Sequence, residues 1–126
     1  MAVKYKLVSR SNPLDRKIPA KSYATAVHEK TFRLKELSRE LAARSTTTSE
    51  GDVYSVLIGL RDLMREHLNR SDRVVIDGIG SFVINLSSAG AESDAKFHPS
   101  LIKKAKVVYR EDSEMKEFTK NVKFEK

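Results

Sequence analysis

The stretch "RVVIDGIGSFVI", residues 73–84, has the apolar pattern of a β-strand but carries Gly78 and Gly80 one residue apart. Glycine weakens the interior of a strand, so the pair needs a structural or chemical reason. A dinucleotide-binding loop requires a third glycine at position 83 and a helix after it, but Val83 stands there and the strand pattern continues. The Gly-Lys-Ser/Thr sequence of a P-loop is also missing. The glycines therefore do not indicate a nucleotide-binding loop.

Two structural explanations remain for the paired glycines. Asp77-Gly78 is a favoured central pair for a two-residue hairpin turn in which both residues take positive φ, so that "RVVI" would pair with "SFVI". Gly80 would then be required where a second backbone passes close by, or where the strand bends to curve the sheet. Both explanations predict a β-hairpin at this point.

Two amphipathic helices are predicted before the hairpin. Residues 34–44, "LKELSRELAAR", place their leucines on one helical face. After the break "STTTSEGD", Ser49 is a candidate N-cap with Asp52 in the acceptor position of a capping box. From residue 53 to about residue 69 apolar residues recur at helical spacing. This apolar stripe is wider than one short helix would cover, which indicates a further packing partner such as a second subunit.

The remaining segments alternate between strand patterns and polar stretches. Strands are predicted at residues 3–8 ("VKYKLV"), 22–27 ("SYATAV") and 105–110 ("AKVVYR"). Residues 87–104 are rich in small and polar residues, which is typical of a loop or an extended arm. A short helix is predicted over 112–120, with Asp112 or Ser113 as its cap. The tail 121–126 is expected to be loosely held.

The composition is that of a globular domain. The 126 residues are 40% hydrophobic and 33% charged, and cysteine is absent, which excludes disulfides and thiolate chemistry. No apolar run approaches the roughly 18 residues of a membrane span, and the N-terminal stretch does not have the pattern of a signal peptide. We therefore expect a cytoplasmic protein without membrane contact.

The net charge of +7 is unevenly distributed along the chain. Residues 1–45 hold 11 Lys and Arg against 4 Asp and Glu, residues 46–80 hold 4 against 6, and residues 81–126 hold 9 against 7. Both ends are thus basic. Such a chain favours polyanionic partners, above all nucleic acid, through phosphate contacts and counterion release. The alternative is a basic surface that serves only solubility.

Catalytic and metal-binding patterns are missing from the sequence. The three histidines, at positions 28, 67 and 98, are scattered, and no H-x-x-x-H spacing or G-x-S-x-G nucleophile motif occurs. The acidic residues are spread along amphipathic helices. We therefore expect no enzyme, no metal, no cofactor and no small-molecule substrate.

The order of these elements resembles the HU/IHF family of bacterial nucleoid proteins. Two helices, a hairpin with "GIGSF", an arm, a returning strand and a short helix follow one another over residues 33–120. Tyr109 and Arg110 stand where the family has Phe-Arg, whereas Glu111 replaces its proline. The chain is most similar to the HU-related variants of Bacteroides-type bacteria, which carry an added N-terminal segment.

The resemblance implies an α+β fold and an intertwined homodimer. Helical pairs would form its base, and a β-hairpin arm at about 87–104 would project from it. Residues 1–32 would form an N-terminal β extension, and residues 121–126 a C-terminal tail.

The resemblance also implies an architectural, largely sequence-independent protein of the nucleoid that binds duplex DNA. Family arms reach into the minor groove, where an apolar wedge near the tip kinks the duplex. Pro99 is the only proline of this arm and hence the wedge candidate, and the alternative is an ordinary loop proline. The candidate DNA-binding residues are Ser81, Lys96, His98, Pro99, Lys103, Lys104, Lys106, Arg110, Lys116 and Lys120.

Two other functions remain open from the sequence. The arm lacks the arginines of the family's arm tip, which favours a structural or assembly module that keeps the dimer fold with weak or lost DNA affinity. RNA binding is the third possibility, but the exposed aromatic platforms expected for single strands are missing. The N-terminal extension could add a strand, protect a sheet edge or contact phosphates.

Overall fold

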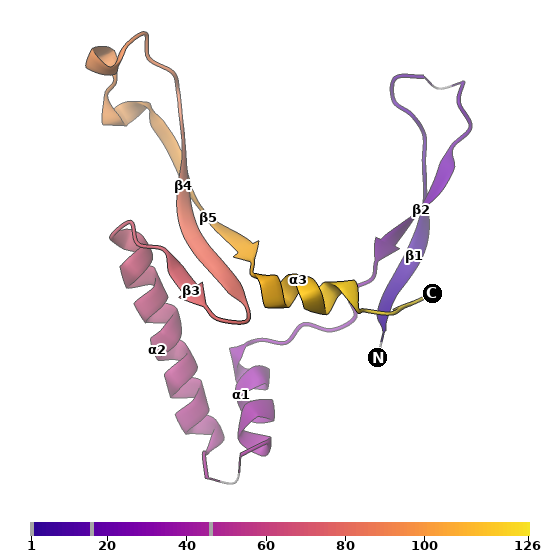
Figure 1. Cartoon of the computed structure of the whole chain (residues 1–126), viewed down its shortest axis with the longest axis vertical. Coiled ribbons are helices and arrows are strands. Elements are labelled where there is room, and N and C mark those ends of the chain that lie inside the picture. Colours follow the sequence, from indigo (N-terminus) through magenta and orange to yellow (C-terminus); the bar gives the residue numbers. More distant parts are fainter. Residues whose placement is uncertain (1, 16, 46) are drawn as a thin grey trace.

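The computed structural model describes residues 2–15, 17–45 and 47–126, which form three parts (Figure 1). A helical hairpin consists of α1 (Leu34–Ala43) and α2 (Glu50–Asn69). One three-stranded sheet has the order β3 (Val74–Ile76), β4 (Gly80–Ser88), β5 (Ile102–Glu111). A second has the order β2 (Lys21–Ala26), β1 (Val3–Arg10), β6 (Phe124–Glu125). The helix α3 (Ser113–Lys120) connects β5 to β6.

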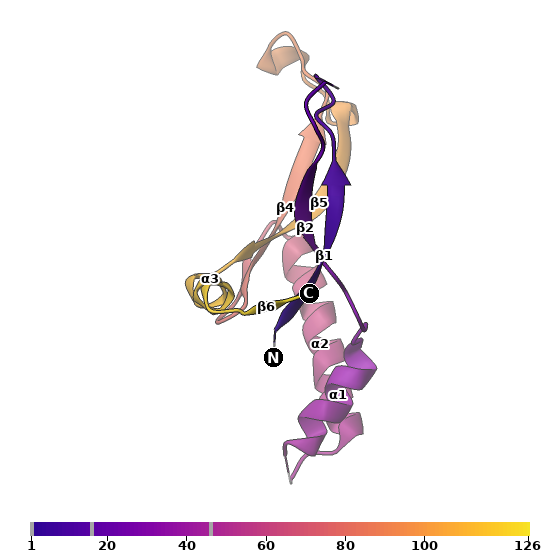
Figure 2. The same cartoon turned by 90° about the vertical axis from the view of Figure 1, so that its right-hand side faces the viewer.

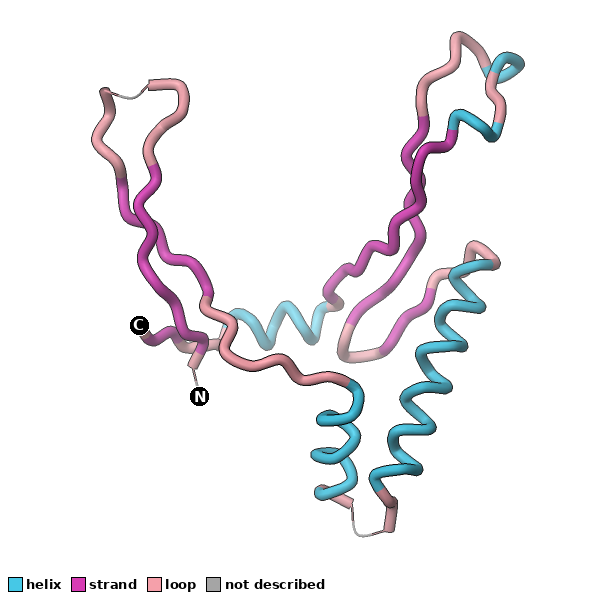
Figure 3. The backbone as a smooth tube through the Cα atoms, turned by 180° about the vertical axis from the view of Figure 1, so that it is seen from behind, coloured by secondary structure: helices cyan, strands magenta, loops and turns pink. Residues whose placement is uncertain are grey.

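The overall shape is open. The β4–β5 ribbon and the β1–β2 ribbon rise on the same side of the molecule, and the helical hairpin extends to the opposite side (Figures 1 and 2). Figure 3 shows the same arrangement from behind, with α3 running between the bases of the two ribbons. The two ribbons and α3 thus define one side of the protomer.

The helical hairpin forms as the sequence predicts. Ser49 caps α2, because its Oγ accepts a hydrogen bond from the Asp52 N–H (3.1 Å). At the start of α1 the Glu36 carboxylate accepts from the Arg33 N–H (3.0 Å). Hydrogen bonds from the backbone amides of Glu36 itself and of Arg33 hold the pKa of the Glu36 carboxyl below its usual value. Within α1 the buried hydroxyl of Ser38 donates to the Leu34 carbonyl (2.6 Å).

The turn between β3 and β4 differs from the predicted two-residue turn. Ile76 pairs with Gly80, so three residues form the loop, and the Ile79 N–H donates to the Ile76 carbonyl (3.0 Å). Within this three-residue loop, Gly78 has a positive φ, +83°, whereas Asp77 and Ile79 do not. The prediction of two central residues at positive φ was wrong because Ile79 also belongs to the turn. Its carbonyl accepts a hydrogen bond from the Tyr109 hydroxyl (2.8 Å), which ties the turn to β5.

Gly80 confirms the prediction that a second backbone passes close by. A Cβ atom at this position would lie 2.2 Å from the Arg110 carbonyl oxygen and 2.7 Å from a ring carbon of Tyr109. The φ angle of Gly80 is also positive, +155°. No side chain fits here without moving β5.

The arm is longer than its sequence pattern predicts. β4 and β5 stay paired from Gly80 and Glu111 out to Ser88 and Ile102, with an irregularity between Ser87 and Ser88. Only residues 89–101 form the connecting loop. Within it lie two short 3₁₀ turns, η1 (Asp94–Lys96) and η2 (Pro99–Leu101).

The C-terminal tail is not loosely held, contrary to the sequence-based prediction. β6 lies parallel to β1, with Val3 opposite Phe124 and Lys4 opposite Glu125. The Val3 N–H donates to the Lys123 carbonyl (2.7 Å). A two-residue strand has no recognisable periodicity, and its partner strand lies more than a hundred residues away in sequence. The N-terminal sheet is therefore attached to the end of α3.

The protomer lacks a closed hydrophobic core. Leu68 is the only buried hydrophobic side chain among the described residues. The accessible surface of 11028 Å² exceeds the about 6,800 Å² expected for a compact monomer of 14.2 kDa. Much of the excess is apolar, including Val56 (70% exposed) and Leu63 (50%) on α2.

Candidate nucleic-acid interface

The β4–β5 ribbon has two chemically different faces. Opposed residues of an antiparallel pair share a face, and successive residues alternate between faces. One face carries the opposed polar pairs Ser81 with Arg110, Asn85 with Lys106, and Ser87 with Lys104, with the apolar pair Val83 and Val108 between the first two. The other carries Phe82 with Tyr109, Ile84 with Val107, and Leu86 with Ala105. The ribbon therefore presents a cationic face and an apolar face.

The cationic face brings together three of the predicted residues. Lys104, Lys106 and Arg110 all project from β5 on this face and are exposed. Lys103 is exposed as well and has no opposed residue on β4, because Ser87 pairs with Lys104 and Ser88 with Ile102. In the part of the chain that the structure describes, none of these four forms an ion pair.

Ser81 lies at the base of the same face and is half-buried. It belongs to the central strand and has Val75 on one side and Arg110 on the other. Because a strand lies on each side of Ser81, its backbone N–H is directed toward a neighbouring strand and takes part in the hydrogen bonding of the sheet. Phosphate contact through the amide of Ser81, one of the two predicted modes, is therefore not available, and the hydroxyl remains.

The residues predicted at the arm tip have local partners. Lys96 forms an ion pair with Glu92 (2.6 Å). The Nδ1 atom of His98 accepts a hydrogen bond from the Ser100 N–H (3.1 Å). Pro99 occupies the first position of η2, where its fixed φ suits the turn. Phe97 is 42% exposed between the two turns.

The helix α3 begins against the hairpin turn and carries the last two predicted cations. Asp112 caps it by accepting from the Met115 N–H (2.8 Å), and a Cβ on Gly78 would lie 2.9 Å from a Glu114 oxygen. Lys116 and Lys120 are four residues apart and thus share one face. Lys120 has Glu117 at 3.8 Å, with both side chains mostly exposed, so this pair is weak.

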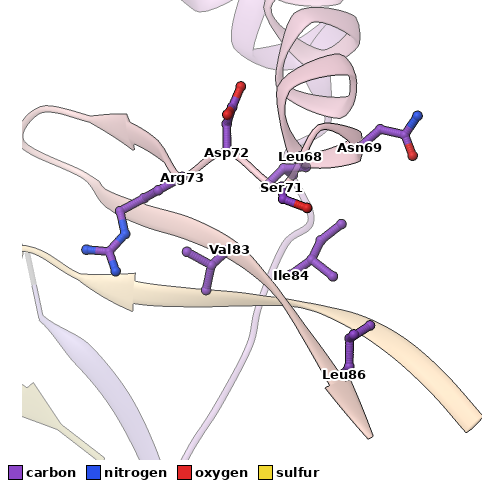
Figure 4. Close-up of a pocket in the computed structure, with 8 residues that line it drawn as sticks. All are labelled: Leu68, Asn69, Ser71, Asp72, Arg73, Val83, Ile84 and Leu86. Carbon is purple, nitrogen blue, oxygen red and sulfur yellow. The ribbon is translucent and has the colours of Figure 1, made fainter. Parts of the chain in front are cut away.

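The apolar face of the ribbon is left open near the end of α2. Leu68, Ile84 and Leu86 line a hollow together with Asn69, residues 71–73 and Val83 (Figure 4). A second hollow beside it is lined by Leu68, Ile84 and Val107. These side chains come from α2, β4 and β5, and the helix does not close over the ribbon within the chain.

The N-terminal sheet contains basic residues that the sequence analysis did not include among the candidates. Lys4 binds Glu29 at 2.6 Å, and this contact raises the pKa of the lysine and lowers the pKa of the carboxyl. Arg10 and Lys21 stand directly opposite each other on β1 and β2. The alternation in residues 3–8 indicated the strand, but the partner of Arg10 follows only from the register.

The described residues contain neither a metal-binding cluster nor a membrane-spanning helix. Among the described residues, no three His, Asp or Glu side chains cluster in a way that could hold a metal ion. Within the same residues, no helix is both long and apolar enough to cross a lipid bilayer.

A family described as "HU domain fused to wHTH, Ig, or Glycine-rich motif" (HU-HIG) matches residues 1–126. The chain belongs to the HU-HIG family. The match covers the N-terminal sheet and the tail of this HU-HIG chain as well as its HU-like part. No curated protein matches its sequence.

Solved structures similar to the HU-HIG chain confirm the predicted α+β, HU-like fold. One, described as a putative bacterial DNA-binding protein from Bacteroides vulgatus, has a TM-score of 0.70 and 11% identity. The match covers 98% of this chain but only 47% of the Bacteroides protein, so this chain spans about half the length of that protein. The other is an Anabaena HU–DNA cocrystal structure, with a TM-score of 0.53 and 18% identity over 71% of this chain and 99% of that one.

Proposed function

We propose that this chain is an architectural DNA-binding protein of the nucleoid that grips the phosphates of duplex DNA. The observation that carries the proposal is the cationic face of the protruding β4–β5 ribbon in an HU-like fold. Exposed lysines on a ribbon suit phosphate contacts, which position a duplex without reading its sequence. The Anabaena structure with a similar fold is described as an HU–DNA complex, which supports the same partner.

The phosphate-binding residues would be Lys103, Lys104, Lys106 and Arg110 on the arm, with Lys116 and Lys120 on α3. With about six phosphates neutralised, the logarithm of the binding constant should fall against the logarithm of salt concentration with a slope near −5. Fluorescence anisotropy with random-sequence duplexes across a salt series measures this slope. An affinity that does not change with salt would contradict the phosphate grip.

The DNA-binding unit would be a homodimer. The stripe Val56, Leu60 and Leu63 lies on one side of α2 and is 41–70% exposed. Obligate dimers bury about 2,000–5,000 Å² summed over both partners. The surplus of roughly 4,200 Å² in this one chain exceeds its share of such an interface. Multi-angle light scattering is expected to give twice the chain mass of 14.2 kDa. A well-folded species with the mass of one chain would contradict the dimer.

Minor-groove insertion by Pro99 is a separate hypothesis about the arm. Apolar side chains that wedge between base steps kink the duplex, at a few kcal/mol per unstacked step. Because Pro99 also starts η2, its replacement should be compared with that of the neighbouring exposed Phe97. Resonance energy transfer across end-labelled DNA measures the bend angle for Pro99→Ala and Phe97→Ala. An angle that Pro99→Ala leaves unchanged removes Pro99 from the mechanism.

A structural or assembly module is the second candidate function. The ion pair between Lys96 and Glu92 favours it, because it leaves the arm tip with little free positive charge. A gel-shift titration with random duplex DNA at low salt separates the two functions. A shift supports the DNA-binding protein, and no shift at tens of micromolar protein supports the module.

A further inference from the structure

The β1–β2 ribbon, like the arm, has one basic face. Its register places Lys6 opposite Thr25, Val8 opposite Tyr23, and Arg10 opposite Lys21, all on one side. The other side carries Tyr5 with Ala26, Leu7 with Ala24, and Ser9 with Ser22. The positive charges of the two strands are thus gathered on one face.

The basic face contains a pair of like charges that destabilises the folded ribbon. Arg10 and Lys21 are directly opposed on adjacent strands, and like charges in this position destabilise a β-ribbon. Neither residue has an acidic partner among the ion pairs of the described residues. The Arg10 guanidinium lies 5.9 Å from the centre of the Tyr23 ring, which orients it without reducing its charge. A bound anion would relieve this repulsion.

The ribbon is fixed to the part of the molecule that carries the proposed DNA-binding residues. β6 follows α3 after only three residues and pairs with β1, where the Val3 N–H donates to the Lys123 carbonyl. Figures 1 and 2 show the β1–β2 ribbon rising on the same side as the β4–β5 arm. A long polyanion bound along the arm and α3 therefore lies on the side of the molecule from which the second ribbon projects.

We propose that the basic face of the β1–β2 ribbon, with Lys6, Arg10 and Lys21, is a second phosphate-binding surface for the same duplex DNA. This inference rests on the proposed function. It assigns the N-terminal extension a direct part in DNA binding, in which it lengthens the contact beyond that of the arm and α3.

The test is the double variant Arg10→Thr with Lys21→Thr in the full chain. Threonine favours strands, and the change removes the like-charge pair, so the variant should melt at or above the wild-type temperature. If both side chains bind phosphate, the salt slope of duplex binding should fall in magnitude by about 2. The matched control, Lys35→Gln with Arg44→Gln, removes the same charge from α1 and its end, on the opposite side of the molecule, and should leave the slope unchanged.

The outcomes separate this inference from the proposed function. If wild-type protein binds with a steep salt slope and the Arg10/Lys21 variant keeps that slope while folded, the second surface is wrong and the arm-based function stands. If the slope falls equally in the control variant, the effect is one of net charge and the inference is also overturned. If wild-type protein binds no duplex at low salt, the proposed function fails, and the inference fails with it.

Discussion

At the scale of single residues, the chain requires glycine at positions 78 and 80 for different physical reasons. Gly78 takes a left-handed φ in the turn, whereas Gly80 is required because the β5 backbone passes against it. The sequence pattern indicated both reasons but not the residue count of the turn. In the structure the third turn residue, Ile79, accepts a hydrogen bond from Tyr109, which stands 30 residues further along the chain.

Gly80→Ala should destabilise the protein by roughly 3 kcal/mol, since an added Cβ meets the Arg110 carbonyl and the positive φ disfavours a side chain. Urea unfolding at fixed protein concentration, followed by circular dichroism, measures the change. Gly90→Ala is the control, because a Cβ there has no atom within 4 Å. It should change stability by less than about 0.5 kcal/mol. Equal effects of the two substitutions would show that the contact with β5 is not important.

At the scale of elements, the N-terminal sheet depends on a short strand from the other end of the chain. β6 places Phe124 beside Val3, and both line an apolar hollow with Tyr5 and Ala26. The tail is thus a structural element, and it determines where the β1–β2 ribbon stands relative to α3.

Phe124→Pro should release β1 from the tail, because it removes the aromatic side chain that lies beside Val3 and lines the apolar hollow with Tyr5 and Ala26. Hydrogen exchange monitored by NMR should show lost protection of the Val3 amide, which binds the Lys123 carbonyl, with little change in α2. Lys126→Pro, one residue beyond β6, is the control and should leave Val3 protected. Unchanged protection in Phe124→Pro would mean that β6 does not hold the sheet.

At the scale of the whole molecule, a single chain leaves many large apolar side chains exposed, which is the basis of the proposed dimer. α2 is apolar on two sides. One side (Val53, Leu57, Met64 and Leu68) is buried or half-buried within the protomer. The other side carries Val56, Leu60 and Leu63, which are exposed. The wide apolar stripe in the sequence is explained by these two sides, of which only one is covered within the chain.

Leu63→Asp should prevent dimer formation, because a carboxylate at a desolvated interface has no partner. Light scattering is expected to give the mass of a single chain or an aggregated species, and the unfolding midpoint should fall. Ser55→Asp adds the same charge at an exposed position of the same helix and should remain dimeric. A Leu63→Asp protein with dimeric mass and wild-type stability would contradict an interface on this side of α2.

The structure places only some of the predicted site residues on one surface. Lys104, Lys106 and Arg110 share a face because strand alternation is readable from spacing once the strand is known. The partners of Lys96 and His98 could not be read in advance, since they depend on the path of the loop at the arm tip. The opposition of Arg10 and Lys21 depends on the register of β1 with β2, across a loop of ten residues.

The amino-acid sequence by itself determined the order of the helices and of the strands other than β6, the caps of α2 and α3, and the need for glycine at position 80. These features follow from local periodicity, capping chemistry and backbone sterics within a few residues. Only the tertiary structure decided that the tail joins the N-terminal sheet, that the two ribbons rise on one side, and that α2 keeps an uncovered apolar stripe. Those features depend on contacts between distant segments, whose geometry no local pattern records.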